Sequence, residues 1–315
     1  MAKLTLKYNN LAALWFHRCL VCNTQVTAPR LTRHGVGKVN VGRHAPMTTE
    51  TYEILAIKYA ERTDRFRAES FIMPAEDDHA TPHPMDYFVW VIRNKARTIL
   101  VDTGFDEAEG KKRKRKVLRA PAAALELIGI AAGQIDQLIV THLHYDHAGT
   151  LGAFPKAHFH LQAAEMQYAT GPCMCHPALR VPFTAEHVCE MVRNVYSGRV
   201  VFHEGDAEIA PGITVHKVGG HSRGLQCVRV ATASGPVVLA SDASHYYENF
   251  EQGKVFPIVV DVENTLRGYT RLNQLAASRR HIVPGHDPLV LQRYPSLNSQ
   301  TAGLVVRLDV PRTDA

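Results

Sequence analysis

Several features are scarce or missing in this sequence of 315 residues, and each absence narrows the class of protein. No stretch approaches the roughly 18 consecutive apolar residues that a membrane-spanning helix needs, so we expect no membrane partner. The six cysteines are scattered and show no disulfide framework, which favours a reducing, cytoplasmic location. With 45% hydrophobic and 21% charged residues, the composition is that of an ordinary globular protein.

Acidic residues are absent from positions 1–46, which hold seven lysines and arginines. Because the formal charge of the chain is +6, subtracting these 7 leaves −1 for residues 47–315. The alkaline isoelectric point therefore describes the N-terminal segment, and we expect no nucleic-acid partner. We interpret 1–46 as a basic extension that is poorly ordered or partly packed on the domain. Its Cys19 and Cys22 stand alone, which favours unpaired thiols over a zinc site.

The rest of the chain divides into a domain predicted over 47–300 and a C-terminal tail over 301–315. Apolar alternation and turn residues predict strands at 52–59, 87–92, 98–101, 137–141, 157–161, 199–203, 213–218, 225–231, 236–241 and 281–283, and helices at 121–132, 163–168, 185–196 and 263–278. This order suits two β-sheets packed face to face with helices outside, an α+β fold. Residues 171–198 form an insertion of the kind that serves as a lid or a pocket wall.

A run of six basic residues, Lys111 to Lys116, precedes the first predicted helix. Such a run could attract a substrate to the rim of a site. Like-charged residues repel one another and prefer water, so we interpret the run as a solvated loop.

The densest cluster of metal-binding side chains is Thr141-His142-Leu143-His144-Tyr145-Asp146-His147, directly after a predicted apolar strand. Residues two apart in extended chain point the same way, so His142 and His144 can bind one metal ion together. Asp146 and His147 lie where we expect the chain to turn into a helix, which would direct them toward a second metal ion. A histidine-rich surface loop is the plain alternative.

Each metal ion needs further ligands, and three candidates lie in loops after predicted strands. His221 follows Gly219-Gly220, which lack side chains and so let the backbone approach a crowded site. Asp242 follows an apolar strand, where a carboxylate is costly to bury unless a cation holds it; its two oxygens could bridge two metal ions. His286 follows the last short strand.

The charges of these residues favour a hydrolytic site. Two divalent metal ions contribute +4, whereas Asp146, Asp242 and a bridging hydroxide contribute −3. The remaining +1 suits an anionic tetrahedral intermediate, and no serine or cysteine nucleophile is required. The prediction is therefore a hydrolase with two divalent metal ions, zinc first and iron, cobalt or manganese as alternatives.

Over residues 50–295 the chain resembles the metallo-β-lactamase superfamily, on the strength of the His-x-His-x-Asp-His motif at 142–147, His221, Asp242 and His286. The resemblance implies a four-layer αββα sandwich. It also implies that His142, His144 and His221 hold one metal, that Asp146, His147 and His286 hold the other, and that Asp242 lies between them. The turn Asp102-Thr103-Gly104 matches a feature of the superfamily that supports the ligand loop.

Within the superfamily the chain is most similar to the N-acyl homoserine lactone lactonases, the quorum-quenching lactonases. The likeness is in Val101 to Phe105, Thr141 to Gly149, Asp242 to Ser244 and Glu248 to Glu251. Many of these lactonases have a tyrosine three residues after the bridging aspartate that contacts the substrate. Here that position is His245, which could donate the hydrogen bond instead; Tyr246 could also do so after a small loop shift.

The resemblance implies hydrolytic opening of a lactone ring, with N-acyl homoserine lactone as the expected small-molecule substrate. A hydroxide between the metal ions would attack the carbonyl carbon, and Asp146 would transfer the proton. Met174, Leu179, Val181 and Phe183 are candidates for an acyl-chain groove. The alternatives are hydrolysis of another lactone, ester, amide or thioester, and a non-catalytic metal-binding or redox protein. The chain would act as a monomer or a homodimer.

Overall fold

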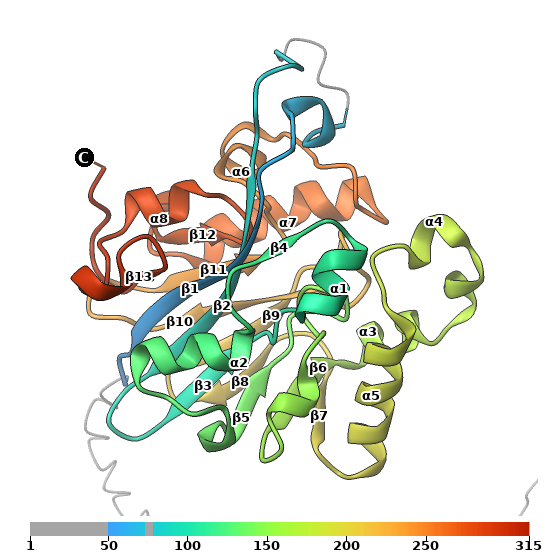
Figure 1. The fold of residues 1–315 in the computed structure, drawn as a ribbon, viewed down its shortest axis with the longest axis horizontal. Helices are drawn as coiled ribbons and strands as arrows, with labels where there is room; N and C mark the ends of the chain where they lie inside the picture. Colours follow the sequence, from blue (N-terminus) through green and yellow to red (C-terminus); the bar gives the residue numbers. More distant parts are fainter. Residues whose placement is uncertain (1–49, 73–77, 315) are drawn as a thin grey trace, which may run out of the picture. The chain divides into compact units, whose positions relative to one another are not determined.

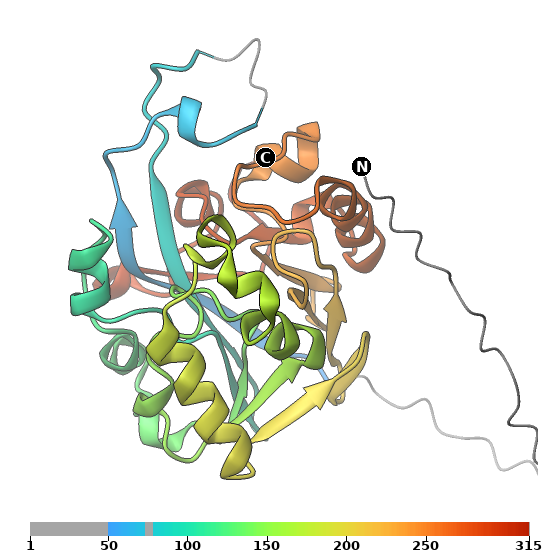
Figure 2. The same cartoon turned by 90° about the vertical axis from the view of Figure 1, so that its right-hand side faces the viewer.

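The computed structural model describes residues 50–72 and 78–314. The predicted basic extension, with Cys19 and Cys22, lies outside the described residues. Two β-sheets pack against each other, and helices lie on both outer sides (Figures 1 and 2). In the described residues no helix has the length and apolar character needed to cross a membrane. The four cysteines there, Cys173, Cys175, Cys189 and Cys227, form no disulfides.

The first sheet has eight strands in the order β13-β1-β2-β3-β5-β6-β7, with β4 paired to β1. Its strands are β1 Glu53–Arg62, β2 Met85–Arg93, β3 Thr98–Val101, β4 Lys116–Val117, β5 Gln137–Ile139, β6 His158–Gln162, β7 Val200–His203 and β13 Val305–Arg307. Strands β1, β2 and β3 are antiparallel, whereas β3, β5, β6 and β7 run parallel.

The second sheet has five strands in the order β12-β11-β10-β9-β8. Its strands are β8 Ala207–Ala210, β9 Ile213–Lys217, β10 Gln226–Val230, β11 Val237–Ser241 and β12 Ile282–Pro284. The last two strands, β11 and β12, are parallel. Because the carboxyl ends of parallel strands meet at one edge of a sheet, the segments that follow them lie close together there.

Eight α-helices complete the described fold: α1 Glu107–Lys112, α2 Pro121–Ala124, α3 Ala163–Ala169, α4 Pro177–Arg180, α5 Ala185–Tyr196, α6 Tyr247–Gln252, α7 Val262–Leu275 and α8 Leu289–Arg293. Helices α6, α7 and α8 lie beside the second sheet, and α2, α3 and α5 beside the first (Figures 1 and 2).

Strand β1 shows how the sequence produces these layers. Its side chains alternate between the two faces of the first sheet. Ile54 and Ala56 join the apolar core between the sheets, whereas Leu55, Ile57 and Tyr59 join the core beneath α2 and α5. A strand buried on both faces reads as a continuous apolar run, as this one does. The predicted four-layer αββα fold is confirmed by the two packed sheets and the helices on their outer sides.

Three details differ from the sequence analysis. The helix predicted over 121–132 is shorter: α2 gives way to a 3-10 turn at Leu125–Ile128, and Gly129 then takes a left-handed conformation with φ 75°. Residues 145–150 form turns rather than the start of a helix. Strand β13 falls within the segment predicted as a C-terminal tail, and its pairing with β1 extends the first sheet into that segment.

Candidate metal centre

The histidine-rich loop begins where β5 ends, at the edge shared by the parallel strands. The side chains of His142 and His144 are buried. The backbone then turns, because the N–H groups of His147 and Ala148 both donate to the carbonyl oxygen of His144 at 3.1 Å. This turn, and not a helix, brings Asp146 and His147 toward the same centre.

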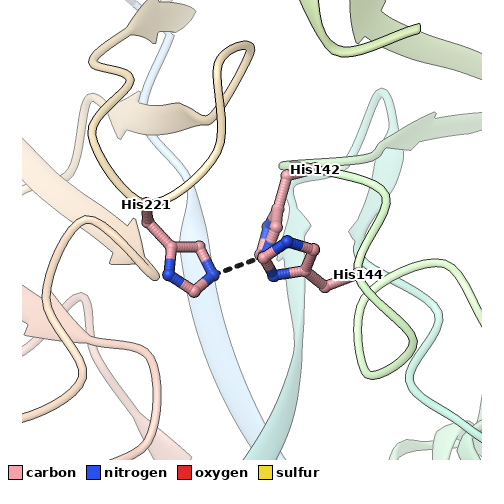
Figure 3. Close-up of side chains that lie close together, drawn as sticks. All are labelled: His142, His144 and His221. Atoms are coloured by element: carbon pink, nitrogen blue, oxygen red, sulfur yellow. Dashed lines mark hydrogen bonds between the residues drawn. The ribbon is translucent and has the colours of Figure 1, made fainter. Parts of the chain in front are cut away.

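The first group of converging side chains is His142, His144 and His221, whose ligand nitrogens lie within 4.8 Å of one another. Figure 3 shows the three imidazoles meeting from two separate loops, with 3.1 Å between the Nε2 atoms of His142 and His221. Gly220 lets the loop of His221 pack closely, because a Cβ atom there would lie 2.7 Å from the backbone of Thr265.

The second group is Asp146, His147 and His286, which meets the same 4.8 Å criterion. The Nε2 atoms of His147 and His286 each lie 3.8 Å from a different carboxylate oxygen of Asp146. His286 comes from the segment after β12, so the pairing of β12 with β11 brings this residue to the site.

Asp242 follows β11 and faces both groups with separate oxygen atoms. Its Oδ2 lies 3.2 Å from Nε2 of His221 and 3.8 Å from Nε2 of His142. Its Oδ1 lies 3.3 Å from Nε2 of His147 and 2.9 Å from Nε2 of His286. The structure thus places all seven residues predicted as metal ligands in one buried set, the ligand cluster: His142, His144, Asp146, His147, His221, Asp242 and His286.

The chemical state of this cluster fits divalent metal ions. Burial, reinforced by neighbouring imidazoles, lowers the pKa values of His142 and His144 well below the usual range, so both rings are neutral. Burial alone would raise the pKa of Asp242, but the surrounding histidines hold it well below its usual value. Among the described residues, buried Nε2 of His147 has no hydrogen-bond partner. Burial alone would lower the pKa of His147, but Asp242, Asp102 and Asp146 raise it well above its usual value. Two neutral imidazoles, an ionised carboxylate and a ring nitrogen without a hydrogen-bond partner are donors of the kind that a divalent metal ion binds.

A second set of hydrogen bonds fixes the orientation of the imidazole rings. Oδ2 of Asp102 lies 2.7 Å from Nδ1 of His147, and the same carboxylate accepts hydrogen bonds from the N–H and hydroxyl of Thr141. Nδ1 of His221 lies 2.5 Å from the carbonyl oxygen of Ile258, and Nδ1 of His286 lies 2.9 Å from that of Asp86. Each Nδ1 is therefore held by an acceptor, which leaves Nε2 directed at the centre.

Glu165 is a functional residue that the sequence analysis missed. Its buried carboxylate accepts hydrogen bonds from the N–H of Leu143, the hydroxyl of Ser222 and the N–H of Gly224. These contacts join the two loops that carry the first group of histidines. The sequence offers no direct signal, because a glutamate in the first turn of a helix, here α3, is ordinarily on the surface.

The two residues proposed to replace the lactonase tyrosine have different positions. Nε2 of His245 lies 3.0 Å from Oδ2 of Asp242, and its ring stacks on Phe256 at 3.7 Å between centroids. Burial lowers the pKa of His245 to about 3. The Tyr246 hydroxyl instead donates to the carbonyl oxygen of Pro84 at 3.2 Å and accepts from Arg65 at 2.6 Å. His245 lines the cavity above the cluster; Tyr246 is not among the residues that line it.

The cavity above the ligand cluster has a volume of about 150 Å³. Outside the ligand cluster its lining includes the acidic Glu69 and a set of basic and apolar side chains, here called the rim: Arg62, Arg65, Arg113, Arg115, Val181, Pro182, Pro257 and Ile258. The interpretation of Lys111 to Lys116 as a solvated loop is wrong for two of its six residues, because the chain turns after α1, where Lys114 has φ 57°. Arg113 and Arg115 turn inward and are half-buried.

Beside this cavity lies a second, larger one of about 830 Å³ that shares Arg113 and Val181 with it. Three of the four residues predicted for an acyl-chain groove line it, namely Met174, Val181 and Phe183. Leu179 is not among the lining residues. The predicted insertion 171–198 therefore forms one wall of an apolar groove next to the cluster.

Comparison with known proteins gives consistent results. Residues 84–304 match the family model described as the metallo-beta-lactamase superfamily. The chain is 30% identical over 217 residues to an N-acyl homoserine lactonase of Bacillus cereus, covering 63% of this chain and 81% of that protein. It is 31% identical over 165 residues to an N-acyl homoserine lactonase of Bacillus thuringiensis, covering 52% of this chain and 60% of that protein.

Solved structures show the same fold. A quorum-quenching N-acyl homoserine lactone lactonase superposes with a TM-score of 0.62 at 24% identity, covering 76% of this chain and 94% of that one. AidC, a dizinc quorum-quenching lactonase solved with the product N-hexanoyl-L-homoserine, superposes with a TM-score of 0.57 at 16% identity, covering 75% and 86%.

Proposed function

The chain belongs to the metallo-β-lactamase superfamily and is a metallo-hydrolase; from this premise we propose that it opens the lactone ring of N-acyl homoserine lactones. The relatives named as lactonases support this substrate class. The product would be the ring-opened N-acyl homoserine, and the biological consequence would be quorum quenching. The cytoplasmic location and the monomeric or homodimeric state remain predictions from the sequence.

The observation that carries the proposal is the position of Asp242 between two groups of ligands, with a different oxygen facing each. A single metal ion would not require two separate sets of three side chains. We therefore propose two divalent metal ions, zinc first, with iron, cobalt and manganese as alternatives. Bound there, they would provide a hydroxide at neutral pH and polarise the substrate carbonyl.

Two residues of the chain would act directly on the reacting groups, and a third would hold the centre together. The Asp146 carboxylate lines the cavity and would take up the proton from the attacking water and return it to the ring oxygen as that oxygen leaves. His245 would form a hydrogen bond to the substrate through the ring nitrogen that does not face Asp242. Asp242 would hold the two halves of the centre at a constant separation.

The acyl chain would leave the cavity past Val181 into the larger apolar groove. Burial of apolar surface there would contribute to binding without contact with the reacting carbonyl. The segment that contains Val181 borders both cavities and can therefore select for the length of the acyl chain. The second candidate function is hydrolysis of another lactone, ester, amide or thioester. It uses the same centre and differs only in which substrates the rim admits.

Metal content and substrate turnover test the proposal together. The purified protein should contain close to two divalent metal ions per chain. It should hydrolyse a panel of N-acyl homoserine lactones, measured as proton release, at higher kcat/KM than simple γ- and δ-lactones. If the protein hydrolyses esters or thioesters but shows no metal-dependent turnover of any lactone, the lactonase proposal is replaced by the second candidate function, hydrolysis of another ester, amide or thioester.

A further inference from the structure

Four arginines line the cavity above the ligand cluster, and they divide into two kinds by their partners. Arg62 lies 3.0 Å from Oδ1 of Asp64 and 2.9 Å from Oε2 of Glu69. Nε of Arg113 lies 2.5 Å from Oε1 of Glu109. The charges of these two guanidinium groups are therefore compensated by carboxylates within the protein.

Arg65 and Arg115 have only neutral hydrogen-bond partners among the described residues. Arg65 donates to the Tyr246 hydroxyl and to the carbonyl oxygen of Glu69, both at 2.6 Å. Arg115 donates to the Tyr145 hydroxyl at 3.3 Å and to the carbonyl oxygen of Arg113 at 2.7 Å. Both side chains are positioned by these bonds, but neither positive charge is matched by a carboxylate ion pair.

For Arg65, burial makes the lack of a carboxylate ion pair significant. Arg65 is only 7% exposed, and a guanidinium stays protonated at any physiological pH. A buried charge without an ionic partner is costly, so proteins seldom retain one without a use. Stability alone therefore gives no reason for Arg65 to line this small cavity. Arg115 is half-buried, and among the groups that raise its pKa is Asp146, which lines the same cavity.

Both arginines reach the cavity from one end of strand β1. Arg65 follows β1 closely, and Arg115 directly precedes β4, whose Lys116 pairs with Glu61 of β1. The same cavity is lined by His144, Asp146, His221, Asp242, His245 and His286. The ligand cluster and the two guanidinium groups therefore border one cavity of about 150 Å³.

We propose that Arg65 and Arg115 form a subsite for a carboxylate carried by the substrate beside its reactive lactone. A guanidinium presents a planar pair of N–H donors that matches the two oxygens of a carboxylate. The inference rests on the proposed lactone hydrolysis and extends it, because N-acyl homoserine lactones are neutral. The class of substrate that the cavity favours is a small γ-lactone with a carboxylate on its ring.

The test compares two substrates that differ in one charge: a γ-butyrolactone with a ring carboxylate and the same lactone with a carboxamide. Metal-loaded full-length protein should give at least a tenfold higher kcat/KM for the carboxylate. Arg115→Met should reduce this ratio by about 10- to 100-fold, mainly through KM, which corresponds to one charge-assisted hydrogen bond. Arg115→Lys should retain part of the preference, because it keeps the charge and loses the planar pair of donors.

Lys111→Met is the matched control, because it removes one positive charge from the same basic run at an exposed side chain that does not line the cavity. It should leave the ratio unchanged. If Lys111→Met lowers the ratio as much as Arg115→Met does, general electrostatic attraction explains the preference and the subsite is rejected.

A binding measurement separates this inference from the proposed reaction. A γ-lactam with the same ring carboxylate serves as an unreactive ligand for calorimetry with the metal-loaded protein. Binding that weakens at least tenfold in Arg115→Met, and not in Lys111→Met, supports the subsite even if no lactone is hydrolysed. Two results together would overturn the subsite: lactone turnover without a preference for the carboxylate, and equal lactam binding by all variants. The lactonase proposal would still stand if neutral lactones were hydrolysed.

Discussion

The ligand cluster and the rim line the same cavity but are built differently. Every member of the cluster is at most 8% exposed, and all follow β-strands in the two packed sheets. Apart from Arg62, which ends β1, the rim comes from loops and short elements, and its Val181 is 62% exposed. Acceptor oxygens of Asp102, Ile258 and Asp86 hold imidazole rings of the cluster in one orientation, whereas Val181 is held through its backbone, by Pro177 and Arg113.

This difference indicates that the residues for the reaction and the residues for substrate preference belong to different parts of the chain. A reaction that depends on metal ions needs ligands held within tenths of an ångström, which strand ends and buried hydrogen bonds provide. A substrate preference depends on side chains at the mouth, which can change without disturbing the sheets. We therefore expect cluster variants to lose metal and turnover, and rim variants to change selectivity alone.

The largest effect should come from Asp242→Asn. The amide nitrogen cannot replace a carboxylate oxygen between the two groups, so metal content should fall and kcat/KM should drop by about 10³-fold. Elemental analysis and lactone hydrolysis measure both. Asp261→Asn is the control, because asparagine also caps a helix such as α7. Full metal content and activity in Asp242→Asn would show that Asp242 does not act between two ions.

Asp102→Asn should have the next largest effect. Asp102 has φ 62°, a left-handed conformation that asparagine also tolerates, so the backbone should be preserved. The variant loses the carboxylate beside Nδ1 of His147, and metal affinity should fall by about 10- to 100-fold. Competition with a chelator measures this, and the exposed Asp136→Asn provides the comparison. Unchanged affinity would mean that Asp102 only supports the loop.

His245→Ala tests whether His245 belongs to the ligand cluster or acts on the substrate. The residue lines the cavity and contacts Asp242, but we assign it to the substrate and not to the metal ions. Loss of one hydrogen bond should lower kcat by about tenfold while the metal content stays at the wild-type level. The exposed His158→Ala serves as control. Loss of metal would move His245 into the cluster, and an unchanged rate would remove it from the mechanism.

Val181→Ser should have the smallest effect and act only on the rim. A polar hydroxyl at the junction of the two cavities should lower kcat/KM for a long-chain N-acyl homoserine lactone by about threefold, with little change for a short chain. Val201→Ser, a partly exposed valine on β7, is the matched control. An equal loss for both chain lengths would place the acyl chain elsewhere.

Much of the fold could be predicted because its elements have strong local signals. Helix α5 begins and ends where the sequence predicts, since its apolar residues recur at helical spacing. The short strands β4, β8 and β13 were missed, because two to four residues carry too little periodicity. Glu165, Arg65 and Arg115 were missed for another reason: each looks like a surface charge until its neighbours from distant segments are known.

The sequence by itself determined which chemistry is available, because metal ligands are specified by residue type and by the spacing His-x-His-x-Asp-His. The tertiary structure alone decided that Asp242 faces both groups of ligands, that Glu165 joins two loops, and that two residues of a basic run turn inward. The physical reason is that these relations depend on distances between segments far apart in the chain. Those distances are set by how the two sheets pair and pack.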